Sequence, residues 1–145
     1  MAGVTTLVAQ SGGAFIENIG QYPPEVKFYT NFNGGKVFIE ATGMTYVFQD
    51  PANFKPIHDH HQGRSVNETE ENYAVKLKFL ETGQGQEVAL GNALPTRYNY
   101  FYSQNPKHWV SGARSFAEVA INDLYPGVDF KLSYEGGQLK YDLLL

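Results

Sequence analysis

The C-terminal stretch, residues 128–145, constrains the fold more than any other part of the chain. It reads Val-Asp-Phe-Lys-Leu-Ser-Tyr-Glu-Gly-Gly-Gln-Leu-Lys-Tyr-Asp-Leu-Leu-Leu. Apolar and polar residues alternate on both sides of Gly136-Gly137, which is the period of a β-strand. Two adjacent glycines suit a type I′ turn, because both central residues of that turn need a positive φ. The stretch therefore predicts an antiparallel hairpin.

The predicted register of this hairpin gathers its apolar side chains on one face. Pairing Glu135 with Gln138 sets the following residues opposite each other: Tyr134 and Leu139, Leu132 and Tyr141, Phe130 and Leu143, Val128 and Leu145. We expect this face to meet one core. On the other face Lys131 falls opposite Asp142, an opposite-charge pair. Since a slip of one residue would bury these charges, the register is well specified.

The second strand of the hairpin ends in three leucines without a polar tail. We expect the chain to be the N-terminal part of a larger β domain, and so a piece of a longer polypeptide. A strand without a neighbour leaves backbone N–H and C=O groups open to pairing. We therefore expect residues 139–145 to form an edge that pairs with another domain of the same polypeptide or with another chain.

The rest of the chain alternates in short runs between turn residues. The ten Tyr, ten Phe and fifteen Gly of the whole chain suit pleated surfaces and turns. A capping box, Ser115-x-x-Glu118, would fit a helix, but the alternation around it favours a strand. Strands are predicted at residues 26–29, 36–40, 44–49, 73–81 (half-buried), 87–90, 97–102 and 115–122, besides the hairpin. The fold class is therefore all-β, an antiparallel sandwich or barrel-like domain of about eight or nine short strands.

Two segments fall outside this pattern. Residues 1–13 predict a flexible N-terminus or the remnant of a signal peptide. Residues 14–145 then form a single β domain, interrupted at residues 50–72 by a long exposed loop that contains prolines, histidines and an acidic run. In residues 18–21, Asn-Ile-Gly-Gln, we expect a turn whose side chains bond to nearby backbone.

Charge and cysteine content narrow the function classes. The formal net charge is −4 and no basic stripe is present, which argues against a nucleic-acid partner. No apolar run is long enough for a membrane-spanning helix, so we expect no membrane insertion. The absence of cysteine excludes disulfides, thiol catalysis and thiolate metal sites.

Three segments resemble a known family. They are residues 15–21 (Phe-Ile-Glu-Asn-Ile-Gly-Gln), residues 98–109 with Tyr-Asn-Tyr-Phe and Asn-Pro-Lys-His-Trp, and residues 123–142 with Leu-Tyr-Pro-Gly-Val-Asp and Gly-Gly-Gln-Leu-Lys-Tyr-Asp. In this order they resemble an uncharacterised N-terminal β-rich domain of large secreted proteins of Bacteroidetes type. Those proteins carry propeller-type (SBBP) repeats, PKD modules or gliding-motility, type IX secretion C-terminal signals.

The resemblance covers nearly the whole chain from Phe15, with two departures: Ile19 stands where a basic residue is common, and residues 50–72 match nothing in the family. It implies export and a role in a secreted or cell-surface protein, and it supplies no known catalytic residues, because none are established for the family.

Two groups of residues are candidates for binding. His58, His60 and His61 are suitable metal ligands, but their tight spacing favours a solvated loop that binds metal weakly. Aromatic side chains at Tyr98, Tyr100, Tyr102 and Trp109 would offer a platform for sugar rings, but packing of the tyrosines in the core or at its rim is the favoured interpretation.

No residue pattern specifies a reaction or a cofactor. The first expectation is a non-catalytic structural or adhesive module. The second is a carbohydrate-binding module that meets surface glycans through its aromatic face. The third is a fragment of a glycan-active enzyme, which would require two facing carboxylates.

Overall fold

The computed structural model describes residues 13–49, 72–83, 86–101 and 103–145. The predicted flexible N-terminus, up to residue 12, and most of the predicted loop at 50–72 lie outside the described residues. So do Tyr102 and the three clustered histidines. Within the described ranges the chain forms eleven strands and one short 3-10 helix, η3: β1 Phe15–Glu17, β2 Val26–Phe32, β3 Gly35–Glu40, β4 Gly43–Gln49, β5 Asn72–Lys78, β6 Glu87–Leu90, β7 Ala93–Tyr100, η3 Pro106–His108, β8 Val110–Phe116, β9 Glu118–Tyr125, β10 Val128–Glu135 and β11 Gln138–Leu144.

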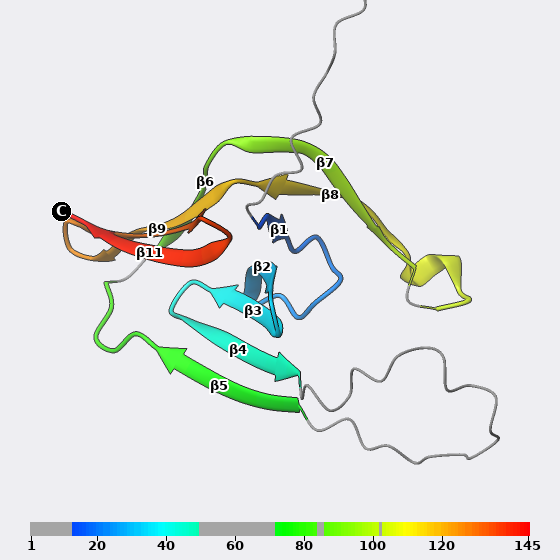
Figure 1. The fold of residues 1–145 in the computed structure, drawn as a ribbon, viewed down its shortest axis with the longest axis horizontal. Coiled ribbons are helices and arrows are strands. Elements are labelled where there is room, and N and C mark those ends of the chain that lie inside the picture. Colours follow the sequence, from blue (N-terminus) through cyan, green and yellow to red (C-terminus); the bar gives the residue numbers. More distant parts are fainter. Residues whose placement is uncertain (1–12, 50–71, 84–85, 102) are drawn as a thin grey trace, which may run out of the picture.

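The strands form two antiparallel sheets that face each other (Figure 1). The first has seven strands in the order β5-β4-β3-β2-β1-β8-β7, and the second has four in the order β11-β10-β9-β6. The all-β prediction is confirmed, and the arrangement is that of a sandwich. The outermost strands among the described residues are β5 and β7 in the first sheet and β11 and β6 in the second.

A two-stranded ribbon passes from one sheet to the other. Strands β6 and β9 pair in the four-stranded sheet, while their continuations β7 and β8 pair in the seven-stranded sheet. At the crossing, Gly91 N–H donates to the Glu118 carbonyl at 3.2 Å, and Ala117 N–H donates to the Asn92 carbonyl at 2.9 Å. A Cβ at Gly91 would lie 2.6 Å from the Glu118 carbonyl oxygen, so the close approach of the two backbones requires glycine there.

The main core fills the space between the sheets. Because side chains alternate between the two faces of a sheet, every second residue of a strand points into this core. Its fully buried members are Phe15, Phe28, Val37, Ile39, Met44, Phe116, Val119, Ile121, Leu124, Phe130 and Leu132. A second, smaller cluster lies on the opposite face of the seven-stranded sheet. It consists of Ile16, Tyr29 and Ala113, with Tyr22, Phe38, Tyr98 and Tyr100 packed against them.

The terminal hairpin has the predicted register. Glu135 pairs with Gln138, Lys131 pairs with Asp142, and the three inner pairs from Tyr134/Leu139 to Phe130/Leu143 are as expected. Gly136 and Gly137 have φ of 57° and 78°, as a type I′ turn requires. The ladder ends at Asp129 and Leu144, so the predicted pair of Val128 with Leu145 does not form.

Other predictions need correction. Residues 115–122 are not one strand, because the chain changes sheets at Ala117 between β8 and β9. Strand β5 is exposed along its whole length, not half-buried, since it is an edge strand and its inner-face side chains are not covered by the described part of the second sheet. The sequence patterns do not predict strand β1, nor the part of β8 that spans residues 110–114.

Candidate binding surfaces

The turn after β1 is built by one side chain, as the sequence predicts. Asn18 Nδ2 donates to the carbonyl oxygens of Tyr22, Pro23 and Val26 at 3.0, 2.9 and 2.8 Å. Its Oδ1 accepts from the backbone N–H groups of Gly20 and Tyr22. These five bonds fix the path of residues 18–26 and hold Tyr22 against the outer face of the seven-stranded sheet.

On that outer face an aromatic group surrounds one ammonium. Lys36 Nζ lies 5.4, 5.0 and 5.8 Å from the ring centroids of Tyr22, Tyr29 and Phe38, and it donates to the Tyr22 hydroxyl at 2.9 Å. Tyr22 packs edge-on against both other rings. The cation–π interactions thus occur within the chain, and Lys36 already fills the space that an external cation would take.

The structure describes three of the four residues of the predicted sugar platform, Tyr98, Tyr100 and Trp109. Tyr98 and Tyr100, on β7, are half-buried against the second cluster. Trp109 lies beyond the end of β7, where its ring packs edge-on against Phe101 at 5.1 Å between centroids. Tyr102 lies outside the described residues. The platform as a whole includes Tyr102 and stays a prediction.

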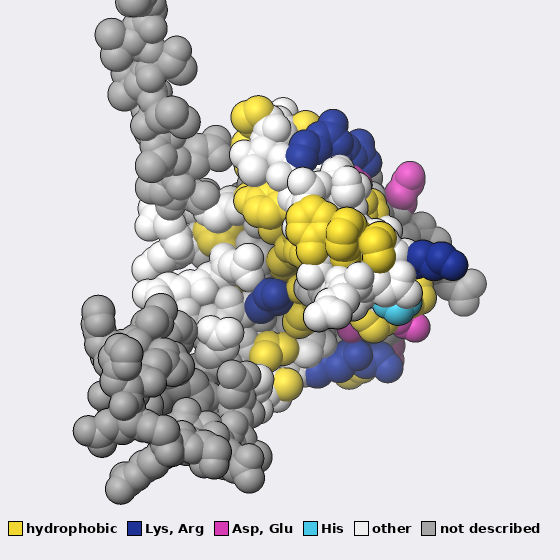
Figure 2. Space-filling model, turned by 90° about the vertical axis from the view of Figure 1, so that its right-hand side faces the viewer, with side chains coloured by type: hydrophobic (Ala, Val, Ile, Leu, Met, Phe, Trp, Pro, Cys, Tyr) yellow, Lys and Arg dark blue, Asp and Glu magenta, His cyan; other side chains and the backbone are white. Residues whose placement is uncertain are grey.

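The Phe101 and Trp109 rings are accessible from solvent. They are 64% and 44% exposed, and the Trp109 indole N–H donates to the Ser103 carbonyl at 2.8 Å, which fixes the ring. Asn105 caps η3 by accepting from the Lys107 N–H at 3.1 Å. On this side of the molecule hydrophobic side chains gather, with basic side chains around them (Figure 2). A fixed, exposed aromatic pair of this kind suits stacking against an apolar ring face.

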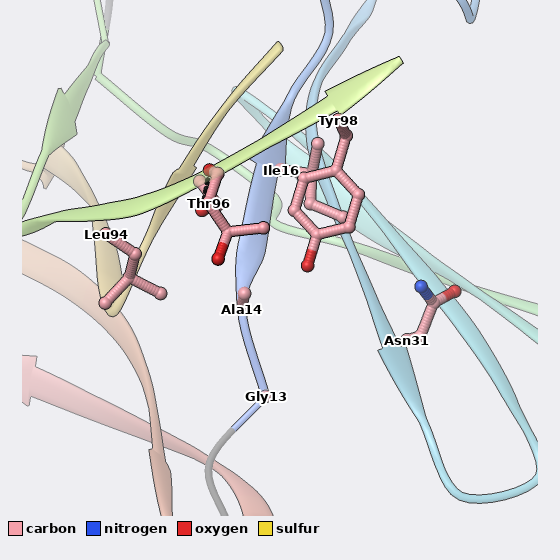
Figure 3. Close-up of a pocket in the computed structure, with 8 residues that line it drawn as sticks. Gly13, Ala14, Ile16, Asn31, Leu94, Thr96 and Tyr98 are labelled. Carbon is pink, nitrogen blue, oxygen red and sulfur yellow. Dashed lines mark hydrogen bonds between the residues drawn. The ribbon is translucent and has the colours of Figure 1, made fainter. Parts of the chain in front are cut away.

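A cavity of about 370 Å³ opens beside Tyr98. Leu94, Thr96 and Tyr98 line it from β7, Ile16 from β1, and Asn31 from β2 (Figure 3). Ser115 Oγ donates to the Thr96 carbonyl at 2.6 Å, so that hydroxyl is committed to the wall. A small ligand in this cavity would meet three polar side-chain groups: the hydroxyls of Thr96 and Tyr98 and the amide of Asn31.

Strand β11 exposes apolar side chains along a free edge. Its inner-face residues Tyr141 and Leu143 are 64% and 60% exposed, although their partners Leu132 and Phe130 on β10 are buried. The prediction that all inner residues of the hairpin lie in one core is therefore wrong for Tyr141 and Leu143. Within the described ranges no strand pairs with the outer side of β11.

Strand β5 is the matching edge of the other sheet. Its inner-face residues Tyr73, Val75 and Leu77 are exposed, and they continue the row of Phe48, Tyr46 and Met44 on β4. Burial raises the pKa of the Tyr46 hydroxyl, and the nearby Tyr141 hydroxyl raises it further. The exposed residues of β5 and β11 show that the inner face of each sheet carries apolar side chains out to its edge strand.

A bidentate ion pair joins β1 to β8. Glu17 accepts from Arg114 Nε at 3.0 Å and Nη2 at 2.9 Å, and also from the Arg114 backbone N–H at 2.9 Å. These hydrogen bonds lower the pKa of Glu17 below 4.5 and raise that of Arg114. A carboxylate held ionised by a bidentate guanidinium is a structural group and a poor proton donor.

No group of three potential metal ligands occurs among the described residues. None of the described helices is long and apolar enough to cross a membrane. A comparison with family models matches residues 15–145 to a domain of unknown function, DUF7948. No curated protein and no solved structure matches the chain.

Proposed function

The chain belongs to the DUF7948 family of domains, and we propose that it is a non-catalytic structural or adhesive module of an exported, cell-surface or extracellular bacterial protein. The exported context rests on the resemblance of residues 15–21, 98–109 and 123–142 to the N-terminal domain of large secreted proteins. In that context the module joins other β structure, either a domain of the same polypeptide or another chain.

One observation carries this proposal: β11 is a regular edge strand with exposed apolar residues on its inner face. Edge strands of soluble proteins are commonly blunted by prolines, bulges or inward-pointing charges, because their open backbone groups recruit other strands. Strand β11 has no proline, and its inner face shows Tyr141 and Leu143 to solvent. Addition of a strand would satisfy the backbone groups and cover both side chains.

The test uses a fluorescent peptide that alternates valine and threonine between terminal lysines. We expect its anisotropy to rise saturably with the protein, and hydrogen exchange at Leu139, Tyr141 and Leu143 to slow. Tyr141→Pro should abolish binding, because it removes an outward N–H, whereas Tyr141→Thr keeps that donor and should retain binding. Failure of the wild-type protein to bind at about 1 mM, roughly −4 kcal/mol, under conditions where it is monomeric would contradict the proposal.

A second candidate function is carbohydrate binding, and the exposed pair of Phe101 and Trp109 favours it. Trp109 is the chain's single tryptophan, so intrinsic fluorescence reports on this site directly. A sugar stacked on the indole should shift the emission of Trp109, and Phe101→Ala should weaken the effect while Tyr98→Phe leaves it unchanged. No change in emission with any of a panel of polysaccharides would exclude this role for the pair.

A further inference from the structure

Strand β11 is complementary to itself. Around Tyr141 its sequence reads Leu139-Lys140-Tyr141-Asp142-Leu143, so each residue on one side has a suitable partner at the same distance on the other. We propose that the strand added at this edge is β11 of a second copy of the chain, antiparallel and related by a two-fold axis at Tyr141. This inference rests on the proposed function, because both use the free edge of β11.

The alternation of backbone hydrogen bonds in the hairpin is compatible with this axis. A two-residue turn is closed by a hydrogen-bonded pair, here Glu135 with Gln138, and bonded pairs alternate along the ladder. Gln138, Lys140, Asp142 and Leu144 therefore bond to β10, and the backbone groups of Leu139, Tyr141 and Leu143 point outward. In a pairing centred on Tyr141 these three residues meet one another, so every outward group finds a partner.

The charges select the same register. On the outer face the two-fold axis sets Lys140 opposite Asp142 of the second copy, twice per dimer. Lys140 Nζ lies 3.1 Å from Glu135 and 3.7 Å from Asp142 in its own chain, yet its side chain is 48% exposed and within reach of another carboxylate. A shift of the axis to Leu139 sets Lys140 opposite Gln138 and loses both opposite-charge pairs.

The apolar residues add to the same arrangement. Leu139 falls opposite Leu143 of the second copy, and the two Tyr141 rings become neighbours on the inner face. The two four-stranded sheets then join into one continuous sheet, an isologous contact that closes at a dimer. Strand β5 offers no equivalent, because it contains Lys76 and Lys78 but no acidic residue.

Charge exchange tests the pairing on the full chain by sedimentation velocity. The wild-type protein should show a concentration-dependent dimer. Lys140→Glu and Asp142→Lys each turn both cross-strand attractions into repulsions, so each should weaken the dimer by about tenfold or more. An equimolar mixture of the two variants should restore it as a heterodimer, because each repulsion then becomes an attraction. Far-UV circular dichroism and thermal melting check that both variants are folded.

A disulfide tests the register even if a charge variant fails to fold. The chain has no cysteine, so Tyr141→Cys introduces a single thiol. A two-fold axis at this residue sets the two Cα atoms about 5.5 Å apart, within the range of a disulfide. We expect rapid oxidation to a covalent dimer. Leu143→Cys is the control, since its two copies lie roughly 13 Å apart along the paired strands.

The outcomes separate the two proposals. A wild-type protein that stays monomeric but binds the alternating peptide retains the proposed function and excludes self-pairing. A protein that neither dimerises nor binds the peptide excludes both. A dimer that persists in both charge variants, or equal oxidation of the two cysteine variants, would show that another surface or register is used and would overturn the inference.

Discussion

The hydroxyl oxygens of Thr30 and Tyr134 lie 2.7 Å apart, although the two residues are 104 positions apart in the sequence. Thr30 is on β2 and Tyr134 on β10, so this contact bridges the two sheets. The Ala14 carbonyl lies 2.8 Å from the Thr30 hydroxyl, and the Asn31 carbonyl 2.9 Å from that of Tyr134. With one proton on each hydroxyl, two of these three contacts are hydrogen bonds at any moment.

Removing the Tyr134 hydroxyl should weaken this bridge without changing the packing of its ring. Tyr134→Phe is expected to lower the free energy of unfolding by about 1 to 2 kcal/mol, because the Asn31 carbonyl loses its donor and Thr30 loses one partner. Urea denaturation measures this loss. The matched control is Tyr141→Phe, whose hydroxyl lies on an exposed residue. Equal stability of Tyr134→Phe and wild type would show that water replaces the bridge.

Two leucines of the terminal hairpin test which part of it is core. Leu132, on β10, is 1% exposed, and Leu132→Ala should cost about 2 to 5 kcal/mol through lost burial and a cavity. Leu143, on β11, has the same inward direction but is largely exposed, and Leu143→Ala should cost less than about 1 kcal/mol. Urea denaturation of both variants at low protein concentration, where self-association is negligible, makes the comparison. A loss below about 0.5 kcal/mol for Leu132→Ala would contradict its place in the core.

Sequence patterns predicted the parts of the fold that depend on neighbouring residues. The hairpin register follows from alternation around Gly136-Gly137, and the Asn18 turn follows from side chains that bond to nearby backbone. The division of residues 115–122 between two sheets did not follow, because it depends on the close approach of Gly91 to Glu118 from another part of the chain. Alternation at residues 119–121 is the same whichever sheet receives the strand.

Exposure of an apolar face is likewise not a local property. The runs of β5 and β11 alternate as half-buried strands do, yet their burial depends on whether a second layer reaches them. The aromatic group around Lys36 joins residues from a turn and two strands, and no periodicity links Tyr22 to Phe38. The one local signal for that group was the Asn18 turn, which carries Tyr22 to its place.

The ion pair of Glu17 and Arg114 predicts a pH dependence of stability. Since Arg114 lowers the pKa of Glu17 in the folded state, the carboxylate stabilises the fold above its unfolded pKa, near 4.5, and this contribution is lost as the pH falls through the folded pKa. Glu17→Gln should cost about 1 kcal/mol at pH 7, and the difference from wild type should shrink as the pH falls below 4.5. Denaturation at a series of pH values measures it.

The control for that series is Glu135→Gln. Glu135 also forms an ion pair, with Lys140 at 3.1 Å, but its side chain is 74% exposed. We expect this substitution to change stability little at any pH, because exposed pairs are screened by solvent. A Glu17→Gln effect that stays constant from pH 7 to pH 3 would show that the side chain acts through packing or neutral hydrogen bonds, and not through its charge.

The Asn18 turn yields the last prediction. Asn18→Asp keeps the oxygen that accepts from Gly20 and Tyr22 but replaces the Nδ2 donor by a second oxygen, which would face the carbonyl oxygens of Tyr22, Pro23 and Val26. Three acceptors then meet a negative charge, so Asn18→Asp should destabilise the fold at least as much as Asn18→Ala, by about 1 to 3 kcal/mol. Acid should reduce the Asn18→Asp defect, because a protonated carboxyl regains one donor. Denaturation of both variants at pH 7 and pH 4 measures the difference in their free energies of unfolding. If Asn18→Asp is as stable as wild type at pH 7, the donations to the three carbonyls contribute nothing, and the oxygen that accepts from Gly20 and Tyr22 is enough to hold the turn.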